Sequence, residues 1–299
     1  MKFLNIESSI SFRDSERVRK ACAPYRLTLG GMHRRNRLGE KAGLGAGSAI
    51  EFQEHRPYQP GDDLRRLDWA AYARSGQMMI RLERREVMPQ LDVTVDLSRS
   101  MWGLTEIKRQ LFIETLAAIL FLADRGRLDV RCLLAGDAFH VVQSRNLAEI
   151  LAACRHAAGD GRRNPADHME TLLASRRRHS AQIWITDLLF PHDPLLLGSR
   201  FAGENAISAI LQVLDPSDVN PSTARQCRLE SCEDGQSLDL NLDESIIENY
   251  RRRFESLRNQ WRERTLARGN IFLSLTAPLP IEKNLSQNWL PAGLVEPGA

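Results

Sequence analysis

The sequence predicts an α/β protein in which a doubly wound, mostly parallel sheet is flanked by helices. Two observations lead to this fold class. Short apolar, β-branched runs alternate with longer helical patterns, and this order is typical of parallel strands joined by right-handed crossovers. Two of the short runs are separated only by Gly136-Asp137, which predicts a tight turn and one antiparallel edge strand on the sheet.

The strands and helices follow from the same patterns, taken in order along the chain. The predicted strands of the sheet are 91–97, 129–135, 138–143, 182–187, 206–214 and 271–275. The predicted helices between them are 105–124, 147–154, 167–178 and a long helix that begins after Asp243. Residues 225–229 and 237–242 are typical of a hairpin. Helix 105–124 is apolar on most sides, so we expect it to be packed inside a layered fold.

Composition is that of an ordinary globular chain. The 299 residues are 42% hydrophobic and 26% charged, and no apolar run approaches the roughly 20 residues that span a bilayer. The five cysteines are odd in number and scattered, which favours reduced thiols and a cytoplasmic protein. The net charge is +3, with the basic excess in the first 90 residues.

The domain organisation is expected to be threefold. Residues 1–88 are interpreted as an N-terminal β-rich attachment, because 78–87 alternates as a strand with one wet face. Residues 89–280 are expected to form the α/β domain. Residues 281–299 are expected to be a tail, because residues 277–299 contain four prolines.

Oxygen side chains follow the first strand of the α/β domain. Asp96, Ser98 and Ser100 alternate directly after it, and Asp187 follows a later strand. Ligands of open α/β sheets bind at the carboxyl ends of the strands, and one carboxylate with two hydroxyls suits a hard cation such as Mg²⁺. On this short motif alone, a simple helix cap by Ser98 or Ser100 is an equally good interpretation.

A second group of distinctive residues lies upstream, between Glu51 and Arg74. Its acids, arginines and aromatics, with a Pro60-Gly61 turn, favour an internal ion-pair network, with a partner surface or a nuclease-like metal site at Asp62, Asp63 and Asp68 as alternatives. The candidate residues of this segment are Arg56, Tyr58, Gly61, Asp62, Asp63, Arg65, Asp68, Trp69 and Arg74.

Together, these motifs resemble two known patterns. Asp96-x-Ser98-x-Ser100 with Thr186-Asp187 resembles the metal-ion-dependent adhesion site of von Willebrand factor A domains. The upstream segment, taken with that motif, resembles the bacterial DUF58 family, which fuses this signature to such a domain. The resemblance implies metal ligands at Asp96, Ser98, Ser100 and Asp187. The adhesion site usually adds a threonine from the middle loop, where this chain offers Asn164 as a substitute.

The resemblance also implies a function. We expect a non-enzymatic binding module or adaptor that recognises a partner's carboxylate through Mg²⁺, with Mn²⁺ or Ca²⁺ as substitutes. Its expected partners are a MoxR-type AAA+ ATPase and that ATPase's client proteins. One alternative is a metal-dependent phosphohydrolase or nuclease using Asp96 and Asp187. A less favoured alternative is nucleic-acid binding through the basic residues of 17–41 and the arginine-rich long helix.

Overall fold

The computed structural model describes residues 12–28, 50–85, 89–102, 105–160, 162–177, 180–194, 197–198, 208–230 and 236–298. By its internal packing the chain divides into two compact units. One unit comprises residues 1–33 and 90–299, and the other comprises residues 34–89. The glycine-rich part of the basic segment, residues 29–49, lies outside the described residues.

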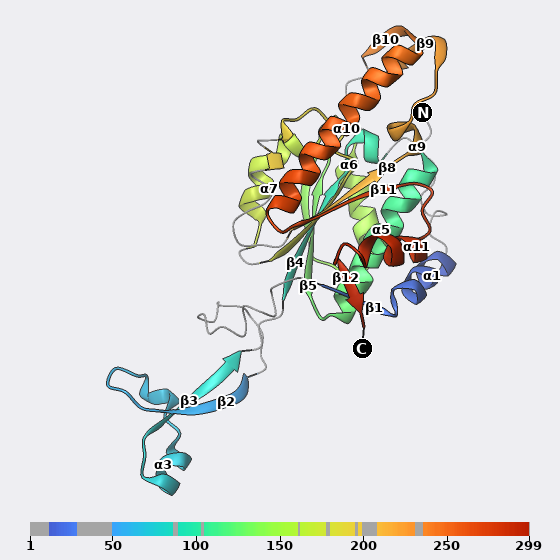
Figure 1. Cartoon of the computed structure of the whole chain (residues 1–299). Coiled ribbons are helices and arrows are strands. Elements are labelled where there is room, and N and C mark those ends of the chain that lie inside the picture. Colours follow the sequence, from blue (N-terminus) through green and yellow to red (C-terminus); the bar gives the residue numbers. More distant parts are fainter. Residues whose placement is uncertain are drawn as a thin grey trace. The chain divides into compact units, whose positions relative to one another are not determined.

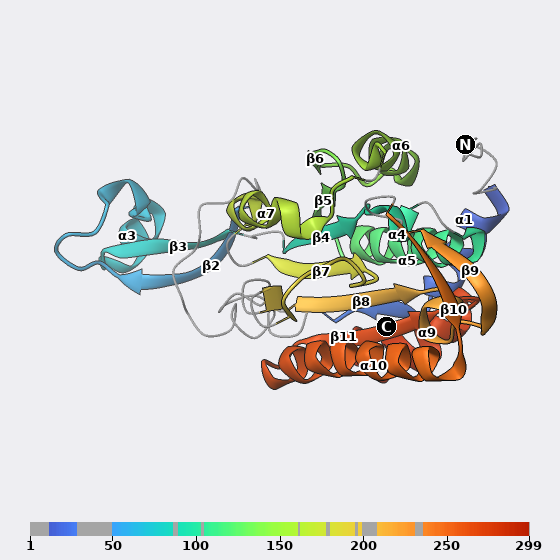
Figure 2. The ribbon, with the colours of Figure 1, turned by 90° about the horizontal axis from the view of Figure 1, so that it is seen from above.

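The larger unit is built on a six-stranded sheet, and its strands follow one another across the molecule in Figure 2. Their spatial order is β11 (Ile271–Thr276), β8 (Ser208–Leu214), β7 (Ala181–Thr186), β4 (Gln90–Asp96), β5 (Asp129–Ala135) and β6 (Phe139–Val142). All neighbours are parallel except β5 and β6, which form the antiparallel edge predicted from Gly136-Asp137. Counted within the sheet, the order is 3-2-1-4-5-6, the doubly wound arrangement. The predicted fold class is therefore confirmed.

Helices cover both faces of this sheet (Figure 1). Helix α5 (Glu106–Arg125) packs on one face together with α1 (Phe12–Cys22), α6 (Leu147–Ala158) and α11 (Ile281–Asn284). The other face is covered by α7 (Met169–Ser175) and by α10 (Glu244–Ala267). Among the described residues, this unit also contains the short helices α4 (Arg99–Trp102), η3 (Pro165–His168) and α9 (Pro216–Val219) and the π-helical turn η4 (Leu285–Trp289).

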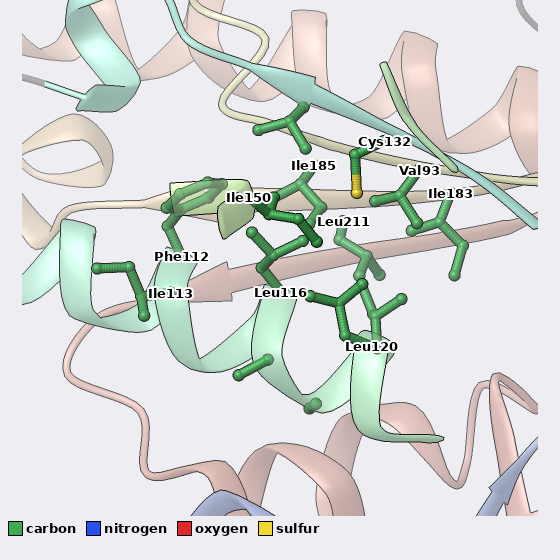
Figure 3. Close-up of a cluster of buried hydrophobic side chains, with 14 of the residues drawn as sticks. Val93, Phe112, Ile113, Leu116, Leu120, Cys132, Ile150, Ile183, Ile185 and Leu211 are labelled. Carbon is green, nitrogen blue, oxygen red and sulfur yellow. The ribbon is translucent and has the colours of Figure 1, made fainter. Parts of the chain in front are cut away.

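The strand period of two divides the core between these layers. Ile183 and Ile185 of β7 lie in the same buried cluster as Phe112 and Leu116 of α5 (Figure 3). The residue between them, Trp184, faces the opposite layer, and its ring lies 5.8 Å from that of Trp261 in α10. Helix α5 is apolar on most sides because the sheet covers one side of it, while α1 and α11 contact another.

The two ends of the larger unit pack together, which corrects two of the predicted boundaries. Strand β1 (Tyr25–Leu27) pairs antiparallel with β12 (Val295–Pro297), so residues 12–28 belong with the sheet and not with the attachment. Residues 281–298 are not a tail, because Ile281, Leu285 and Trp289 are completely buried in the core.

The predicted helix 167–178 is also shorter than expected and consists of η3 followed by α7.

Beyond the sheet, the larger unit carries the expected hairpin, β9 (Ala224–Glu230) paired with β10 (Ser237–Leu242). The long helix α10 begins where Asp243 caps it, with Asp243 Oδ1 accepting from Ile246 N at 3.0 Å. In the part of the chain that the structure describes, no helix combines the length and apolarity needed to cross a bilayer.

The smaller unit contains an antiparallel pair, β2 (Ile50–Pro57) and β3 (Met79–Arg85). Between these strands lie the short helices η2 (Leu64–Arg66) and α3 (Trp69–Ser75). Leu67 and Ile80 are buried and bridge to each other, which gives this β-rich unit a small core of its own.

Candidate functional site

The first component of the candidate site is the loop at the end of β4. Asp96 and Ser98 are completely buried there. Asp96 Oδ1 accepts a hydrogen bond from Ser98 N at 2.9 Å, which fixes the turn into α4. The hydroxyls of Ser98 and Ser100 lie 3.1 Å apart, so the alternating oxygens converge as the sequence pattern predicts.

The end of β7 completes the cluster. Thr186 Oγ1 donates to Asp96 Oδ2 at 2.6 Å, and Thr186 Oγ1 in turn accepts from Leu188 N at 3.0 Å. Strands β4 and β7 are neighbours where the strand order reverses, which is the position where ligands of doubly wound sheets bind. We call Asp96, Ser98, Ser100, Thr186 and Asp187 the oxygen cluster.

Asp187 is held differently from Asp96. Its Oδ1 accepts from Leu189 N at 3.0 Å, and its Oδ2 accepts from Lys108 Nζ at 2.8 Å. Leu188, which stands between Asp187 and Leu189, has a φ of +59°. This left-handed backbone conformation is costly for a residue with a bulky side chain. The backbone after β7 is thus bent so that the carboxylate of Asp187 meets the ammonium of Lys108.

Lys108 was not among the predicted site residues. It lies in the first turns of α5, is 1% exposed, and also donates to Asp218 Oδ2 at 2.9 Å. A sequence signal does exist, because Lys108 stands four residues before Phe112 and so falls on a buried face of an apolar helix. A lysine at such a position requires an anionic partner.

A second set of polar contacts comes from the loop after β8. Asp215 caps α9 through Ser217 N at 2.9 Å, and Thr105 Oγ1 donates to Asp215 Oδ2 at 2.6 Å. Asp218 Oδ2 accepts from Asp215 N at 2.8 Å. The hydroxyl of Tyr250 in α10 donates to Asp218 O at 2.6 Å. Lys108 therefore joins the oxygen cluster to α9 and, through α9, to α10.

The charges of the cluster are unevenly compensated. Burial, reinforced by the negative charge of Asp187, raises the pKa of Asp96 to about 7. Burial alone would lower the pKa of Lys108, but the charges of Asp187 and Asp218 outweigh burial and raise it. Asp187 thus faces a full positive charge, whereas Asp96 is met by neutral donors.

The donors of the cluster fit a hard divalent cation in kind. A carboxylate and three hydroxyls converge at Asp96, and oxygen ligands are those that Mg²⁺ prefers. Asp187 differs because its Oδ2 is already engaged by Lys108. Among the residues described, no three His, Cys, Asp or Glu side chains are grouped closely enough to hold an ion by themselves. A metal here would depend on the hydroxyls as well as on the acids.

Asn164, the predicted substitute for a middle-loop threonine, lies at the start of η3. Its Oδ1 accepts from Ala166 N at 2.9 Å, and its backbone N donates to Asp167 Oδ2 at 2.9 Å. The side-chain oxygen of Asn164 therefore caps this short helix, and its role as a metal ligand stays a prediction.

The upstream signature residues lie in the smaller unit, where several of them shape the backbone. Arg56 forms a two-point ion pair with Asp62, at 2.8 and 2.6 Å. Gly61, with a φ of +104°, provides the turn that brings Asp62 back to Arg56. Asp63 caps η2 through Arg65 N at 3.0 Å, and Asp68 caps α3 through Ala71 N at 2.9 Å. These contacts support the structural interpretation of the acids.

Other residues of the signature are available for contact. Trp69 is 68% exposed, and its ring meets that of Tyr72 edge-on at 6.4 Å. Arg65 and Arg74 are also exposed, and Tyr58 is half-buried. An exposed tryptophan on a short helix with no buried residue adds little to stability, so it is a candidate for recognition.

The described cysteines offer no reactive thiolate. Burial raises the pKa of the Cys22 and Cys132 thiols to about 12 and also raises that of Cys154. These three thiols are free but stay protonated, so they are not nucleophiles at neutral pH. Cys227 and Cys232 lie outside the residues whose side chains are described.

Fold and site together define an α/β module with a doubly wound sheet and a hydroxyl-rich cluster around Asp96 at its switch point. Residues 54–264 match the family described as "Protein of unknown function DUF58", and the chain belongs to this family.

Relatives of known sequence share most of the chain. An uncharacterized protein of Mycobacterium bovis, Mb1516, is 30% identical over 224 residues, which cover 72% of this chain and 70% of the relative. An uncharacterized protein of Mycobacterium tuberculosis, Rv1480, matches to the same extent.

Two solved structures show a more distant similarity. One is an aerotolerance-related membrane protein from Bacteroides fragilis, at 11% identity and a TM-score of 0.37, covering 67% of this chain and 97% of that protein. The other is the conserved hypothetical protein BatB from Bacteroides thetaiotaomicron, at 12% identity and a TM-score of 0.36, covering 67% and 96%.

Proposed function

We propose that this chain is a non-catalytic protein-binding module that recognises a partner's carboxylate through a divalent cation at the oxygen cluster. The observation that carries the proposal is the convergence of Asp96, Ser98, Ser100 and Thr186 within hydrogen-bond contact at the switch point. Asp96, Ser98, Ser100 and Asp187 would hold Mg²⁺, with Asn164 as a further candidate. Mn²⁺ or Ca²⁺ could replace Mg²⁺.

The chemistry of such a site follows from its low charge. When bound, the cation supplies an electrophilic position open to an external carboxylate, because hydroxyl ligands do not neutralise it. The protein residues have simpler tasks. Ser98 N and Thr186 Oγ1 orient the two oxygens of Asp96, and the bent backbone at Leu188 holds Asp187 at the edge of the cluster.

The residues beside Asp96 favour binding over hydrolysis. Phosphohydrolases of the haloacid dehalogenase type carry a second aspartate two residues after the nucleophilic one, and in this chain that position is Ser98. The basic face of α10 is also partly engaged locally, because Arg258 pairs with Glu255 at 2.6 Å and Arg251 bonds to Asn220. This gives the nucleic-acid alternative little support.

The expected partner is a MoxR-type AAA+ ATPase, with that ATPase's client proteins as further candidates. The support for this partner is family membership together with the exposed aromatic pair of the smaller unit, Trp69 and Tyr72.

The test is the affinity of the purified full chain for a purified MoxR-type ATPase from the same organism. It is measured by biolayer interferometry in Mg²⁺ and in EDTA. We expect binding that weakens in EDTA and that Asp96→Ala weakens to the same extent. Asp160→Ala, at an exposed acid outside the cluster, is the matched control and should behave as wild type. Equal binding in Mg²⁺ and EDTA would contradict a role for the metal in recognition.

A further inference from the structure

Lys108 is the residue at this site that neither the sequence motif nor the proposed function explains. Its ammonium lies 2.8 Å from Asp187 Oδ2 and 2.9 Å from Asp218 Oδ2. The side chain of Lys108 is only 2% exposed, and that of Asp187 is completely buried. We infer that Lys108 is a built-in cation that occupies Asp187 and that a divalent ion has to displace it. This inference rests on the proposed function.

The charge of Lys108 opposes the binding of a cation. Its ammonium neutralises the carboxylate of Asp187, which would otherwise be available as a metal ligand at the end of β7. A divalent ion bound beside an unmoved Lys108 would face a positive charge at short range in a poorly screened interior, where such repulsion is strong. Lys108 therefore lowers the affinity of the oxygen cluster for cations for as long as it stays on Asp187.

The contacts of Lys108 allow it to leave Asp187 without losing every partner. Lys108 has two acceptors from different elements, Asp187 after β7 and Asp218 in α9. The side chain of Asp218 is 17% exposed, so it lies nearer the surface than Asp187. Lys108 can thus release Asp187 and still keep an ion pair with Asp218, which avoids leaving an unpaired buried charge. Because Asp218 remains as a partner, the ion pair of Lys108 with Asp187 can be broken more easily than an isolated buried ion pair.

A movement of Lys108 would also affect α9 and α10. Asp218 O accepts from Tyr250 of α10 at 2.6 Å, and Asp218 Oδ2 also accepts from Asp215 N. A shift of Lys108 toward Asp218 would therefore act directly on α9 and on the helix that contacts it. Binding of a cation at the oxygen cluster would in this way change the positions of α9 and α10, which lie outside the cluster.

The experiment is a calorimetric titration of Mg²⁺ alone into the purified full chain and its variants. Lys108→Met removes the ammonium and keeps most of the side-chain volume, and we expect it to bind Mg²⁺ about tenfold more tightly or better. Lys20→Met, at an exposed lysine outside the site, is the matched control and should bind as wild type does. Equal or weaker binding by Lys108→Met would overturn the inference.

A second measurement needs no variant of Lys108 and therefore holds even where Lys108→Met does not fold. The rate at which an acetylating reagent modifies Lys108, followed by mass spectrometry, should rise when Mg²⁺ is added to wild type and stay constant in Asp96→Ala. An unchanged rate in wild type would overturn the inference.

The outcomes also separate this inference from the proposed function. If wild type binds Mg²⁺ and Asp96→Ala does not, while Lys108→Met equals wild type, only the inference is wrong. If neither wild type nor Lys108→Met binds Mg²⁺, the metal-dependent function and the inference are both wrong.

Discussion

Thr186 and Asp96 are 90 residues apart in sequence and are joined by a hydrogen bond of 2.6 Å from Thr186 Oγ1 to Asp96 Oδ2. Both residues are completely buried, and each ends one of two adjacent parallel strands. This contact makes the ends of β4 and β7 a single polar unit.

Thr186→Val should destabilise the protein while keeping the side-chain shape. The substitution removes the donor to Asp96 Oδ2 and leaves a buried carboxylate oxygen without it, which costs about 1–3 kcal/mol. Urea unfolding followed by circular dichroism measures the change in the free energy of unfolding. Thr186→Ser retains the hydroxyl and should cost less, and an equal loss in both variants would show that the hydrogen bond is not the cause.

Asp96→Asn should stabilise the metal-free protein at pH 8. The pKa of Asp96 is raised by burial and by Asp187 to about 7, so its stabilising contribution is present below its unfolded pKa and is lost as the pH rises through about 7. Thermal unfolding in EDTA should show an advantage of Asp96→Asn that grows as the pH rises from about 4 to about 7 and is constant above that. A variant that is less stable than wild type at pH 8 would contradict the assigned environment of Asp96.

A buried carboxyl group whose pKa is raised to about 7 destabilises a fold when it ionises, and such groups are typical of functional sites. Asp96 therefore stands apart from Asp92, which lies on the same strand and is equally buried. Asp92 accepts hydrogen bonds from Arg131 and Arg177. Burial tends to raise the pKa of Asp92, but these two arginines outweigh burial and lower it.

The acid stability of the fold should depend on Asp92. Because its folded-state pKa is lowered, its contribution is present above the ordinary aspartate pKa and is lost as the pH falls below about 4. Asp92→Asn should cost about 3 kcal/mol at pH 7, since it removes the carboxylate that pairs with the half-buried Arg131 and Arg177, although Arg177 keeps its ion pair with Asp129. Urea unfolding at pH 7, 5 and 3 should show the gap between variant and wild type closing toward pH 3, and a gap of constant size would contradict this assignment.

Trp69→Ala should leave stability unchanged and weaken partner binding. Trp69 is 68% exposed, so its removal should change the free energy of unfolding by no more than about 0.5 kcal/mol. The same interferometry assay with the MoxR-type ATPase measures binding. Leu238→Ala, at an exposed apolar residue of the β9–β10 hairpin, is the control, and unchanged binding by Trp69→Ala would remove this residue from the recognition surface.

Local patterns predicted much of the fold. Alternating and apolar runs placed β4 and β5, Gly136-Asp137 placed the antiparallel edge, and Asp243 placed the start of α10. The segment 281–298 was mistaken for a tail because its prolines suggested irregular chain. Its burial depends on contacts with α5 and on the pairing of β12 with β1, which no local pattern encodes.

The candidate site was predictable only in part, for a similar reason. Asp96, Ser98 and Ser100 are close in sequence, and a common sheet edge suggested that Asp187 would join them. The hydrogen bond from Thr186 and the ion pair of Lys108 with Asp187 depend on how side chains pack after the strands are in place. Lys108 in particular comes from a helix whose other buried residues are mostly apolar, where a charged partner for Asp187 was not anticipated.

The proposed function requires the oxygen cluster to hold a divalent cation, and a calorimetric titration of Mg²⁺ into the metal-free full chain at pH 8 tests this requirement. We predict saturable binding of one Mg²⁺ per chain in wild type and in Asp160→Ala, and its loss in Asp96→Ala. Absence of binding in wild type, or binding that persists unchanged in Asp96→Ala, would contradict the claim.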